Sequence, residues 1–371
     1  MVATRQAFPS DLDRLATPAA IVDLDVMEAN LARVADYARA HTIALRPHAK
    51  THKTAALAAE QVARGAVGVT VATAHEAEVM ATAVSDILVA YPPVGPARIA
   101  RLLALPESVR VSVALDSIEA LEGLAEAAAA RGREAGVLVE LDVGMHRVGV
   151  QTPEAALELA RRAATLRGVR YEGVLCYPGH IREHVSAQEP ALRRLAADLE
   201  AFLDALERGG LAPRVVSGGS TPTLFASHRI PQLSEMRPGT YIFNDRTTAA
   251  IGACAWTDCA YSVLATVVST AVSGQAAVDA GSKALNREDI RGVDAPGFGA
   301  LLDRPGVVVK AMSEEHGLLD LAATDWQPRV GERVRIVPNH VCISVNLHEW
   351  VHGVRAGVVE RSWSVAARGW D

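Results

Sequence analysis

The chain has few of the features that mark several common protein classes. It holds only four cysteines in 371 residues, none of them in a C-x-x-C pair, so neither a disulfide framework nor a C-x-x-C zinc or redox motif is indicated. Aromatic residues make up only 4%, which disfavours a surface for stacking bases. The formal net charge is −6, and lysine and arginine are scattered along the chain. We therefore expect no nucleic-acid partner.

Long hydrophobic runs are also missing. The most apolar runs, 87–93 and 260–272, contain polar residues or are shorter than the about 20 residues of a membrane-spanning helix. The first 15 residues include Arg5, Asp11 and Arg14, and they lack the apolar segment of a signal peptide. We expect a cytoplasmic protein with reduced cysteines and no membrane partner.

The sequence does have segments of helical periodicity that alternate with runs of strand-forming residues. Hydrophobic residues make up 50%, which is enough to build a large core. Stretches of helical periodicity cover 27–40, 54–64, 75–83, 117–131, 153–167 and 187–208. Runs of strand-forming residues lie mostly between them, at 20–25, 43–48, 67–72, 87–91, 110–115, 137–143, 173–177, 214–217 and 241–243. Eight or nine such units over about 230 residues favour a closed (β/α)₈ barrel over an open sheet of five or six strands.

The alternation of helix-like and strand-like segments ends after about residue 251. Helical periodicity is scarce from there on, and strand-like runs at 262–272, 275–280, 306–312, 332–337 and 353–362 are separated by Gly, Pro and Asp. This pattern predicts a mostly antiparallel β domain. We expect a barrel over 17–250 and a β domain over 251–371, with 1–16 packing on the β domain.

Lys50 is the most specific single candidate for a catalytic residue. It follows a predicted barrel strand, at the end where such barrels place their sites. It is flanked by His48, His52 and Lys53, and positive neighbours favour the neutral amine that a Schiff base requires. The alternative interpretation is a solvated basic loop.

A loop rich in Gly, Ser and Thr, Ser217–Thr223, follows a late strand of the predicted barrel. Backbone N–H groups, hydroxyls and a helix start at Pro222 together suit an anion, and the position matches the usual phosphate site of such barrels. The alternative is an ordinary capped turn.

The segment 337–345 carries a second pair of candidates, His340 and Cys342. If the segment is a strand, the two side chains point to one face. Imidazole and thiolate suit Zn²⁺, and two protein ligands leave positions for water or substrate. The alternative is a histidine and a cysteine packed in the core.

Three weaker candidates also follow predicted strands. Arg147 could bind an anion or only pair with a carboxylate. His180 and His184 could supply an acid or a base, or they could be ordinary surface histidines.

Together these segments resemble the fold-type III pyridoxal-phosphate enzymes of the D-threonine aldolase and D-serine dehydratase family. The resemblance covers nearly the whole chain, and the segments that carry it are 17–23, 46–53, 142–149, 217–223, 237–241, 313–317 and 338–342. The lysine and His-x-Cys segments are the specific motifs. The Arg147 segment and the Gly/Ser/Thr loop are shared with a wider set that includes alanine racemases.

The resemblance implies an alanine racemase-like fold, a homodimer and a role for each candidate. Lys50 would bind pyridoxal 5'-phosphate covalently and take part in catalysis, with His180 and His184 as further acid or base candidates. His340 and Cys342 would hold a divalent metal (Zn, Mn or Mg) beside the substrate's β-hydroxyl. Arg147 would lie near the phenolic oxygen of the cofactor and Tyr177 near its ring. The remaining implied cofactor-binding residues, around the phosphate, are Ser220, Thr221, Gly239, Thr240 and Tyr241.

The implied activity is a lyase acting on β-hydroxy-D-amino acids. Aldol cleavage to glycine and an aldehyde ranks first on overall likeness to the aldolases. Dehydration, which converts D-serine to pyruvate and ammonia, is the alternative, because the dehydratases carry His-x-Cys where many aldolases carry His-x-Asp. Racemisation needs no metal, so His340 and Cys342 count against it. A non-catalytic carrier of the cofactor would resemble the barrel alone, so the predicted C-terminal β domain with its metal pair counts against that interpretation.

Overall fold

The computed structural model describes residues 9–369, and its chain divides into two compact units. The first, here called the barrel unit, is formed by residues 32–239. The second, the β unit, combines residues 9–31 with 240–368. We expected the division after residue 250; in the structure it falls after Gly239, and residues 17–31 belong to the β unit.

Eight parallel strands form the barrel unit's sheet, in the order β2-β9-β8-β7-β6-β5-β4-β3. Backbone hydrogen bonds from Val67 N to Leu45 O (2.9 Å) and from Thr70 N to Pro47 O (2.8 Å) join β3 to β2 and close the barrel. The strands are β2 (Ala44–Leu45), β3 (Val69–Val71), β4 (Asp86–Val89), β5 (Arg110–Leu115), β6 (Ala135–Leu141), β7 (Val169–Cys176), β8 (Val215–Gly218) and β9 (Glu235–Met236).

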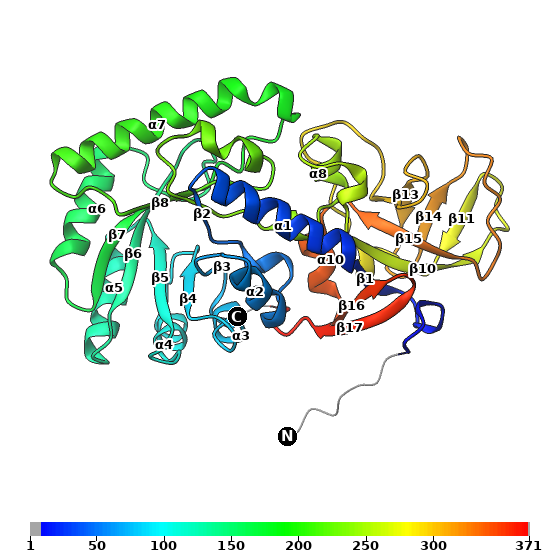
Figure 1. Ribbon diagram of the computed structural model, residues 1–371, viewed down its shortest axis with the longest axis horizontal. Helices are drawn as coiled ribbons and strands as arrows, with labels where there is room; N and C mark the ends of the chain where they lie inside the picture. Colours follow the sequence, from blue (N-terminus) through cyan, green and yellow to red (C-terminus); the bar gives the residue numbers. More distant parts are fainter. Residues whose placement is uncertain (1–8, 370–371) are drawn as a thin grey trace. The chain divides into compact units, whose positions relative to one another are not determined.

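Helices cover the outer side of these strands, as Figure 1 shows for α5, α6 and α7. Side-chain caps start several of them: Thr73, Ser117 and Thr152 each accept a hydrogen bond from a backbone N–H in the first turn. The helices are α1 (Leu24–Ala40), which contains the division between the units, and α2 (Ala55–Ala63), α3 (Ala74–Met80), α4 (Pro96–Leu103), α5 (Ile118–Ala130), α6 (Pro153–Thr165) and α7 (Glu189–Arg208).

The β unit is built on a mostly antiparallel nine-stranded sheet, in which β1 pairs antiparallel with β10 and parallel with β16. Its strands are β1 (Ala19–Asp23), β10 (Tyr261–Ser269), β11 (Gln275–Val278), β12 (Gly299–Leu301), β13 (Val309–Met312), β14 (Gly317–Asp320), β15 (Arg333–Pro338), β16 (Trp350–Arg355) and β17 (Val358–Ser364). Its helices are α8 (Arg246–Ala250), α9 (Ser282–Leu285) and α10 (Val341–Leu347). The predicted fold class, a (β/α)₈ barrel with a mostly antiparallel β domain, is confirmed.

Four of the predicted strands were wrong in detail. The run 353–362 is not one strand but covers parts of β16 and β17 and the turn between them. The run 20–25 forms a strand, but of the β unit. The run 241–243 lies in a 3₁₀ turn (Thr240–Ile242), closed by hydrogen bonds from Phe243 N and Asn244 N to Thr240 O. The segment 337–345 does not continue as a strand, because β15 ends at Pro338 and α10 begins at Val341.

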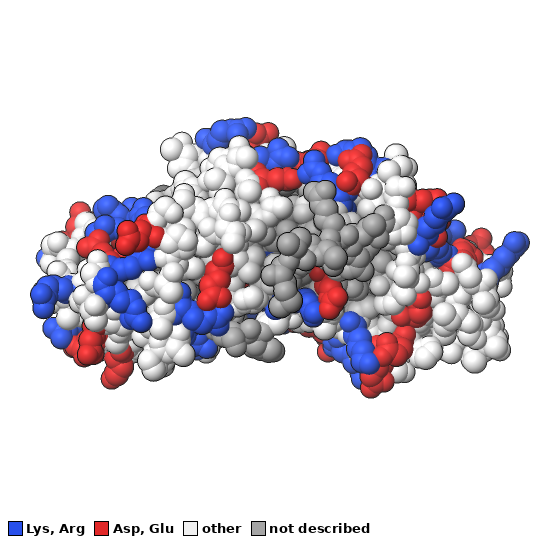
Figure 2. Space-filling view, turned by 90° about the horizontal axis from the view of Figure 1, so that it is seen from below, with Lys and Arg blue, Asp and Glu red and all other residues white. Residues whose placement is uncertain are grey.

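No helix within residues 9–369 is long and apolar enough to cross a membrane. On the face drawn in Figure 2, acidic and basic side chains are interleaved, and neither sign forms a continuous patch.

Candidate functional site

The segments that follow the barrel strands bring most of the predicted cofactor residues to one end of the barrel unit. Because the strands are parallel and the barrel is closed, their carboxyl ends form a single rim. The residues at this rim are Lys50 after β2, Arg147 after β6, Tyr177 and His180 after β7, Ser220 and Thr221 after β8, and Gly239 after β9.

Lys50 lies in a short 3₁₀ turn (Ala49–Thr51) that begins at His48. Its Nζ stands 5.8 Å from the centroid of the Tyr177 ring. Within residues 9–369 this amine makes no hydrogen bond and no ion pair. A half-buried lysine in that condition is available for covalent chemistry.

Lys53, the other lysine of the segment, is engaged elsewhere. Its Nζ lies 2.7 Å from Glu76 Oε1, and the side chains of the pair are 10% and 1% exposed. The structure thus places the two lysines in different environments, although they are three residues apart. One is fixed in a buried ion pair, and the other faces the rim.

The histidines beside Lys50 do not supply the positive charge that we expected from the sequence. Burial, helped by Lys50 and Arg237, lowers the pKa of His48 well below its usual value. Burial also lowers the pKa of His52 to about 4, and its ring is held by Gln61 and the backbone N–H of Thr54. Both imidazoles are therefore neutral at pH 7. That part of the sequence argument was wrong.

Arg147 also lies by the Tyr177 ring, with its guanidinium carbon 5.0 Å from the ring centroid. The loop that carries it is folded around Asp142, which accepts hydrogen bonds from Gly144 N (3.0 Å) and His146 N (2.9 Å). Although burial raises the pKa of Asp142, these bonds and others lower it to about 2. Asp142 is thus a charged anchor for the Arg147 loop.

The loop after β8 fits a phosphate group. Gly219 has φ +81°, a conformation that favours glycine, and the Ser220 and Thr223 hydroxyls lie 3.1 Å apart. Thr221 Oγ1 is buried and has no hydrogen-bond partner among the described residues. A Cβ at Gly239 would lie 2.8 Å from Thr51 Oγ1. An unpartnered hydroxyl beside a glycine turn is what an incoming phosphate oxygen would need.

The two histidine candidates occupy different positions. His180 is exposed, and its ring lies so close to Gly144 that a Cβ there would be 3.1 Å from Nε2. His184 starts a 3₁₀ turn by accepting from Ser186 N, and its Nδ1 lies 2.8 Å from the Ser186 hydroxyl. Nothing in these contacts joins either ring to Lys50, so their catalytic roles stay predictions.

His340 and Cys342 meet in the β unit, but not through a strand. His340 is the N-cap of α10, and its imidazole is hydrogen-bonded to Cys342. Asp245 Oδ2 lies 3.2 Å from His340 Nδ1 and accepts a hydrogen bond from Val341 N. That capping carboxylate explains why a β-branched segment forms a helix here. Burial lowers the pKa of His340, but Cys342 and Asp245 raise it to about 10.

This donor set suits a divalent metal, although no group of three or more His, Cys, Asp or Glu within 9–369 is arranged to hold one. A histidine that ligates a metal usually has its other ring nitrogen bound to a carboxylate, which is the relation of His340 to Asp245. Thr240 and Tyr241, predicted at the cofactor, also belong to the β unit, where Thr240 Oγ1 lies 3.9 Å from Cys342 Sγ.

Three residues beside these groups were given no role by the sequence reasoning. Asp245 lies outside every motif. Arg237 begins a segment of the resemblance and is buried, with Nη2 2.7 Å from Cys176 O. Glu140 is a buried carboxyl near the end of β6. The signal for Glu140 was in the sequence, because it is a single acid in an otherwise apolar strand.

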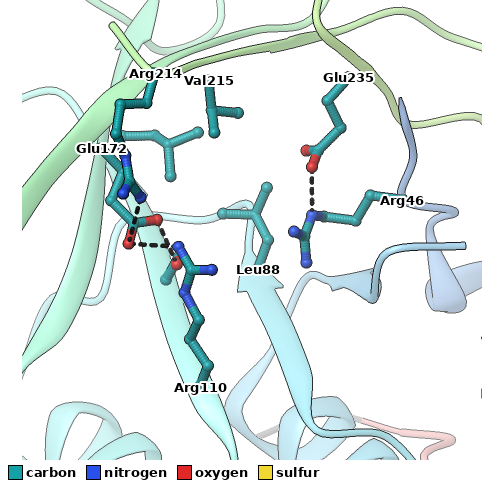
Figure 3. Close-up of a pocket in the computed structure, with 9 residues that line it drawn as sticks. Arg46, Leu88, Arg110, Glu172, Arg214, Val215 and Glu235 are labelled. Atoms are coloured by element: carbon teal, nitrogen blue, oxygen red, sulfur yellow. Dashed lines mark hydrogen bonds and ion pairs between the residues drawn. The ribbon is translucent and has the colours of Figure 1, made fainter. Parts of the chain in front are cut away.

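A polar cavity of about 330 Å³ lies within the barrel unit and is lined by residues of β4 to β9 together with Arg46 and Arg214 (Figure 3). Its charges are paired with one another: Arg46 Nε with Glu235 (2.8 Å) and Arg110 with Glu172 (2.7 Å). It stands apart from the rim that carries Lys50. We interpret it as a polar closure of the barrel base.

Comparison with known proteins agrees with this architecture. Residues 22–247 match the alanine racemase N-terminal domain family, and residues 260–354 match a serine dehydratase domain family. A D-threonine aldolase from Arthrobacter sp. is 34% identical over 98% of this chain and 96% of its own. A D-threo-3-hydroxyaspartate dehydratase from Delftia sp. strain HT23 is 40% identical over 88% of this chain and 91% of its own.

Solved structures give the same result. The D-threonine aldolase of Filomicrobium marinum is similar with a TM-score of 0.90 and 35% identity, over 98% of this chain and 99% of its own. A cysteine-to-alanine variant of D-threo-3-hydroxyaspartate dehydratase, described as metal-free, has a TM-score of 0.89 and 34% identity, over 98% and 100%. The chain therefore belongs to the fold-type III pyridoxal-phosphate family of D-threonine aldolases and D-serine dehydratases.

Proposed function

We propose that the protein is a pyridoxal-phosphate- and metal-dependent lyase acting on β-hydroxy-D-amino acids. The observation that carries this proposal is Lys50, whose amine has no hydrogen bond or ion pair among the described residues and faces Tyr177 at the barrel rim. A lysine held for structure would be paired, as Lys53 is with Glu76. The homodimer and the cytoplasmic location stay predictions from the sequence.

The residues at the rim divide the work of holding the cofactor. Lys50 would carry it, the Thr221 hydroxyl and the Gly219 turn would receive its phosphate, and Arg147 and Tyr177 would face its ring system. When bound, pyridoxal phosphate supplies an electron sink for the charge released at the substrate's Cα.

His340 and Cys342 would hold the metal, with Asp245 orienting the imidazole. A nitrogen and a sulfur ligand suit Zn²⁺, and a metal with open positions can polarise a substrate oxygen as a Lewis acid. The related dehydratase variant is described as being in the metal-free form, which is consistent with metal binding by that relative.

Aldol cleavage, the first candidate on overall likeness, requires a proton to leave the β-hydroxyl while the Cα–Cβ bond breaks. A specific observation favours dehydration as the second candidate. The metal pair contains Cys342 in place of the aspartate of many aldolases, and a relative at 40% identity is named a dehydratase. In that reaction Lys50 Nζ would accept the Cα proton, and hydroxide would leave Cβ.

Product analysis tests both the class and the branch. The purified chain, loaded with pyridoxal phosphate and Zn²⁺ or Mn²⁺, is incubated separately with D-threonine, L-threonine, D-serine and a D-3-hydroxyaspartate. Aldol cleavage of D-threonine gives glycine and acetaldehyde, whereas dehydration gives a 2-oxo acid and ammonia. Equal turnover of D- and L-threonine would contradict the proposed D-specific lyase.

A further inference from the structure

Two buried side chains at the rim end of the barrel carry polar atoms without partners. Glu140 is 3% exposed, and its Oε2 has no hydrogen bond among the described residues. Arg237 is 5% exposed; its Nη2 donates to Cys176 O, but its Nε has no partner within 9–369. Buried polar atoms are nearly always paired, so two unpaired atoms of opposite charge in one place require an explanation.

Glu140 points into the barrel. Leu138, two residues earlier on β6, lines the interior cavity, and alternate residues of a strand share a face. The neighbouring strand β7 carries a second interior glutamate, Glu172, which provides a comparison. Its oxygens are taken up by Arg110, Arg170 and the Ser112 hydroxyl, which lower its pKa although burial opposes them.

The carboxylate of Glu172, away from the proposed site, is therefore paired, whereas that of Glu140, next to the proposed site, is not. Four ionisable groups surround Glu140: Asp116 after β5, Cys176 on β7, Arg147 after β6 and Arg237 after β9. Burial raises the pKa of the Cys176 thiol to about 12, so it is neutral. Burial raises the pKa of Glu140 to about 7, against the attraction of the two arginines.

We propose that Glu140 is a positioning residue that takes up one proton from solvent when an anion binds at the Lys50 rim. As a carboxylate, Glu140 offsets the positive charge of Arg237 and Arg147 that would attract the anion; as a carboxylic acid it leaves that charge to the ligand. The only chemical change is the addition of one proton from solvent to the carboxylate. The inference deepens the proposed function and rests on it, because the anion is taken to be pyridoxal phosphate.

The coupling must act in both directions. An added anion disfavours the ionised carboxyl group and moves its midpoint upward. By the same linkage, protonation of Glu140 strengthens binding of the anion. Glu140→Gln keeps the volume of the side chain and removes its proton-binding group, so it should abolish both effects.

The test follows the infrared C=O band of carboxylic acids in the full chain freed of cofactor, between about pH 5 and pH 9. In the unsubstituted protein we expect a band that disappears with a midpoint near pH 7. Adding pyridoxal phosphate should raise that midpoint by about one pH unit. Glu140→Gln should lack the band, and the matched variant Glu172→Gln should keep it, because Glu172 is already ionised over this range. Glu140→Leu replaces the glutamine variant if the latter does not fold.

Each outcome decides the matter. A band that persists in both Glu140 variants, or no band titrating near pH 7, overturns the inference whether or not the cofactor binds. A Glu140 band that titrates but does not shift while cofactor absorbance develops overturns the coupling and leaves the proposed function intact. Failure of the unsubstituted protein to bind pyridoxal phosphate at all overturns the proposed function, and the coupling with it.

Discussion

Replacing Lys50 and Lys53 in turn should separate cofactor attachment from stability. Lys50→Ala should abolish the visible absorbance of the bound cofactor and all turnover, and it should leave the thermal unfolding of the cofactor-free protein unchanged. The reason is that Lys50 Nζ makes no hydrogen bond or ion pair within residues 9–369. Lys53→Met should do the reverse: the cofactor stays bound, and the protein unfolds at a lower temperature.

The size of the second effect follows from the pair that Lys53 forms. Its Nζ lies 2.7 Å from Glu76 Oε1, and Glu76 is 1% exposed. Removing one member of a buried ion pair costs about 3–5 kcal/mol. Glu76 Oε2 still accepts a hydrogen bond from Ala72 N, which puts the cost at about 3 kcal/mol. For a unit of this size that is a fall of about 6–12 °C in melting temperature.

The assay is an absorbance spectrum and a thermal scan of each variant, with borohydride reduction to fix the cofactor in place. The double variant Lys53→Met with Glu76→Gln is the control, since it removes both charges and should regain part of the lost stability. The reasoning fails if Lys50→Ala still yields a borohydride-reducible cofactor link. It also fails if Lys53→Met loses the cofactor without losing stability.

Three further predictions address other parts of the site and the barrel. Cys342→Ala should keep cofactor absorbance and melting temperature but lose bound metal and lower turnover by orders of magnitude. A lower melting temperature with full activity and unchanged metal content would show that His340 and Cys342 are only packed in the core. Thr221→Val removes a hydroxyl without a partner among the described residues, so the cofactor-free protein should lose no stability. Cofactor affinity, measured by absorbance titration, should fall about tenfold. Unchanged affinity would exclude the loop after β8 as the phosphate site. Burial lowers the pKa of His52 from 6.5 to about 4, so its stabilising contribution is complete above pH 6.5 and is lost as pH falls through 4. In denaturant unfolding, the loss of stability over that interval should be about 3 kcal/mol smaller in His52→Gln than in the unsubstituted protein.

The barrel could be predicted because most of its strands are apolar and alternate with amphipathic helices. The strand that the sequence missed, β9, has only two residues and begins with Glu235. Its carboxylate is buried because Arg46 and the Ser217 hydroxyl satisfy it from neighbouring segments. Local pattern places a glutamate at the surface, and only the closed barrel supplies the partners that bring it inside.

The candidate site was predictable to the extent that its residues stand in short segments. Lys50, His340 and Cys342 stood out by residue type and spacing alone. Asp245 did not, because its contact with His340 spans 95 positions of the chain. The strand argument that paired His340 with Cys342 was wrong, although the two side chains do meet, since Asp245 caps a helix in a segment whose β-branched residues favour a strand.

The basic segment 46–53 shows how the fold selects one reactive group from several. From the local sequence alone, its five basic residues predict a solvated loop. In the structure Arg46 and Lys53 are bound by buried carboxylates of other segments, and His48 and His52 are kept neutral by burial. Of these five, as the described part of the chain shows them, Lys50 alone lacks a hydrogen bond or ion pair for its side chain. The availability of its amine is therefore a property of the folded barrel, in which each of the other four basic groups of the segment has been paired or neutralised.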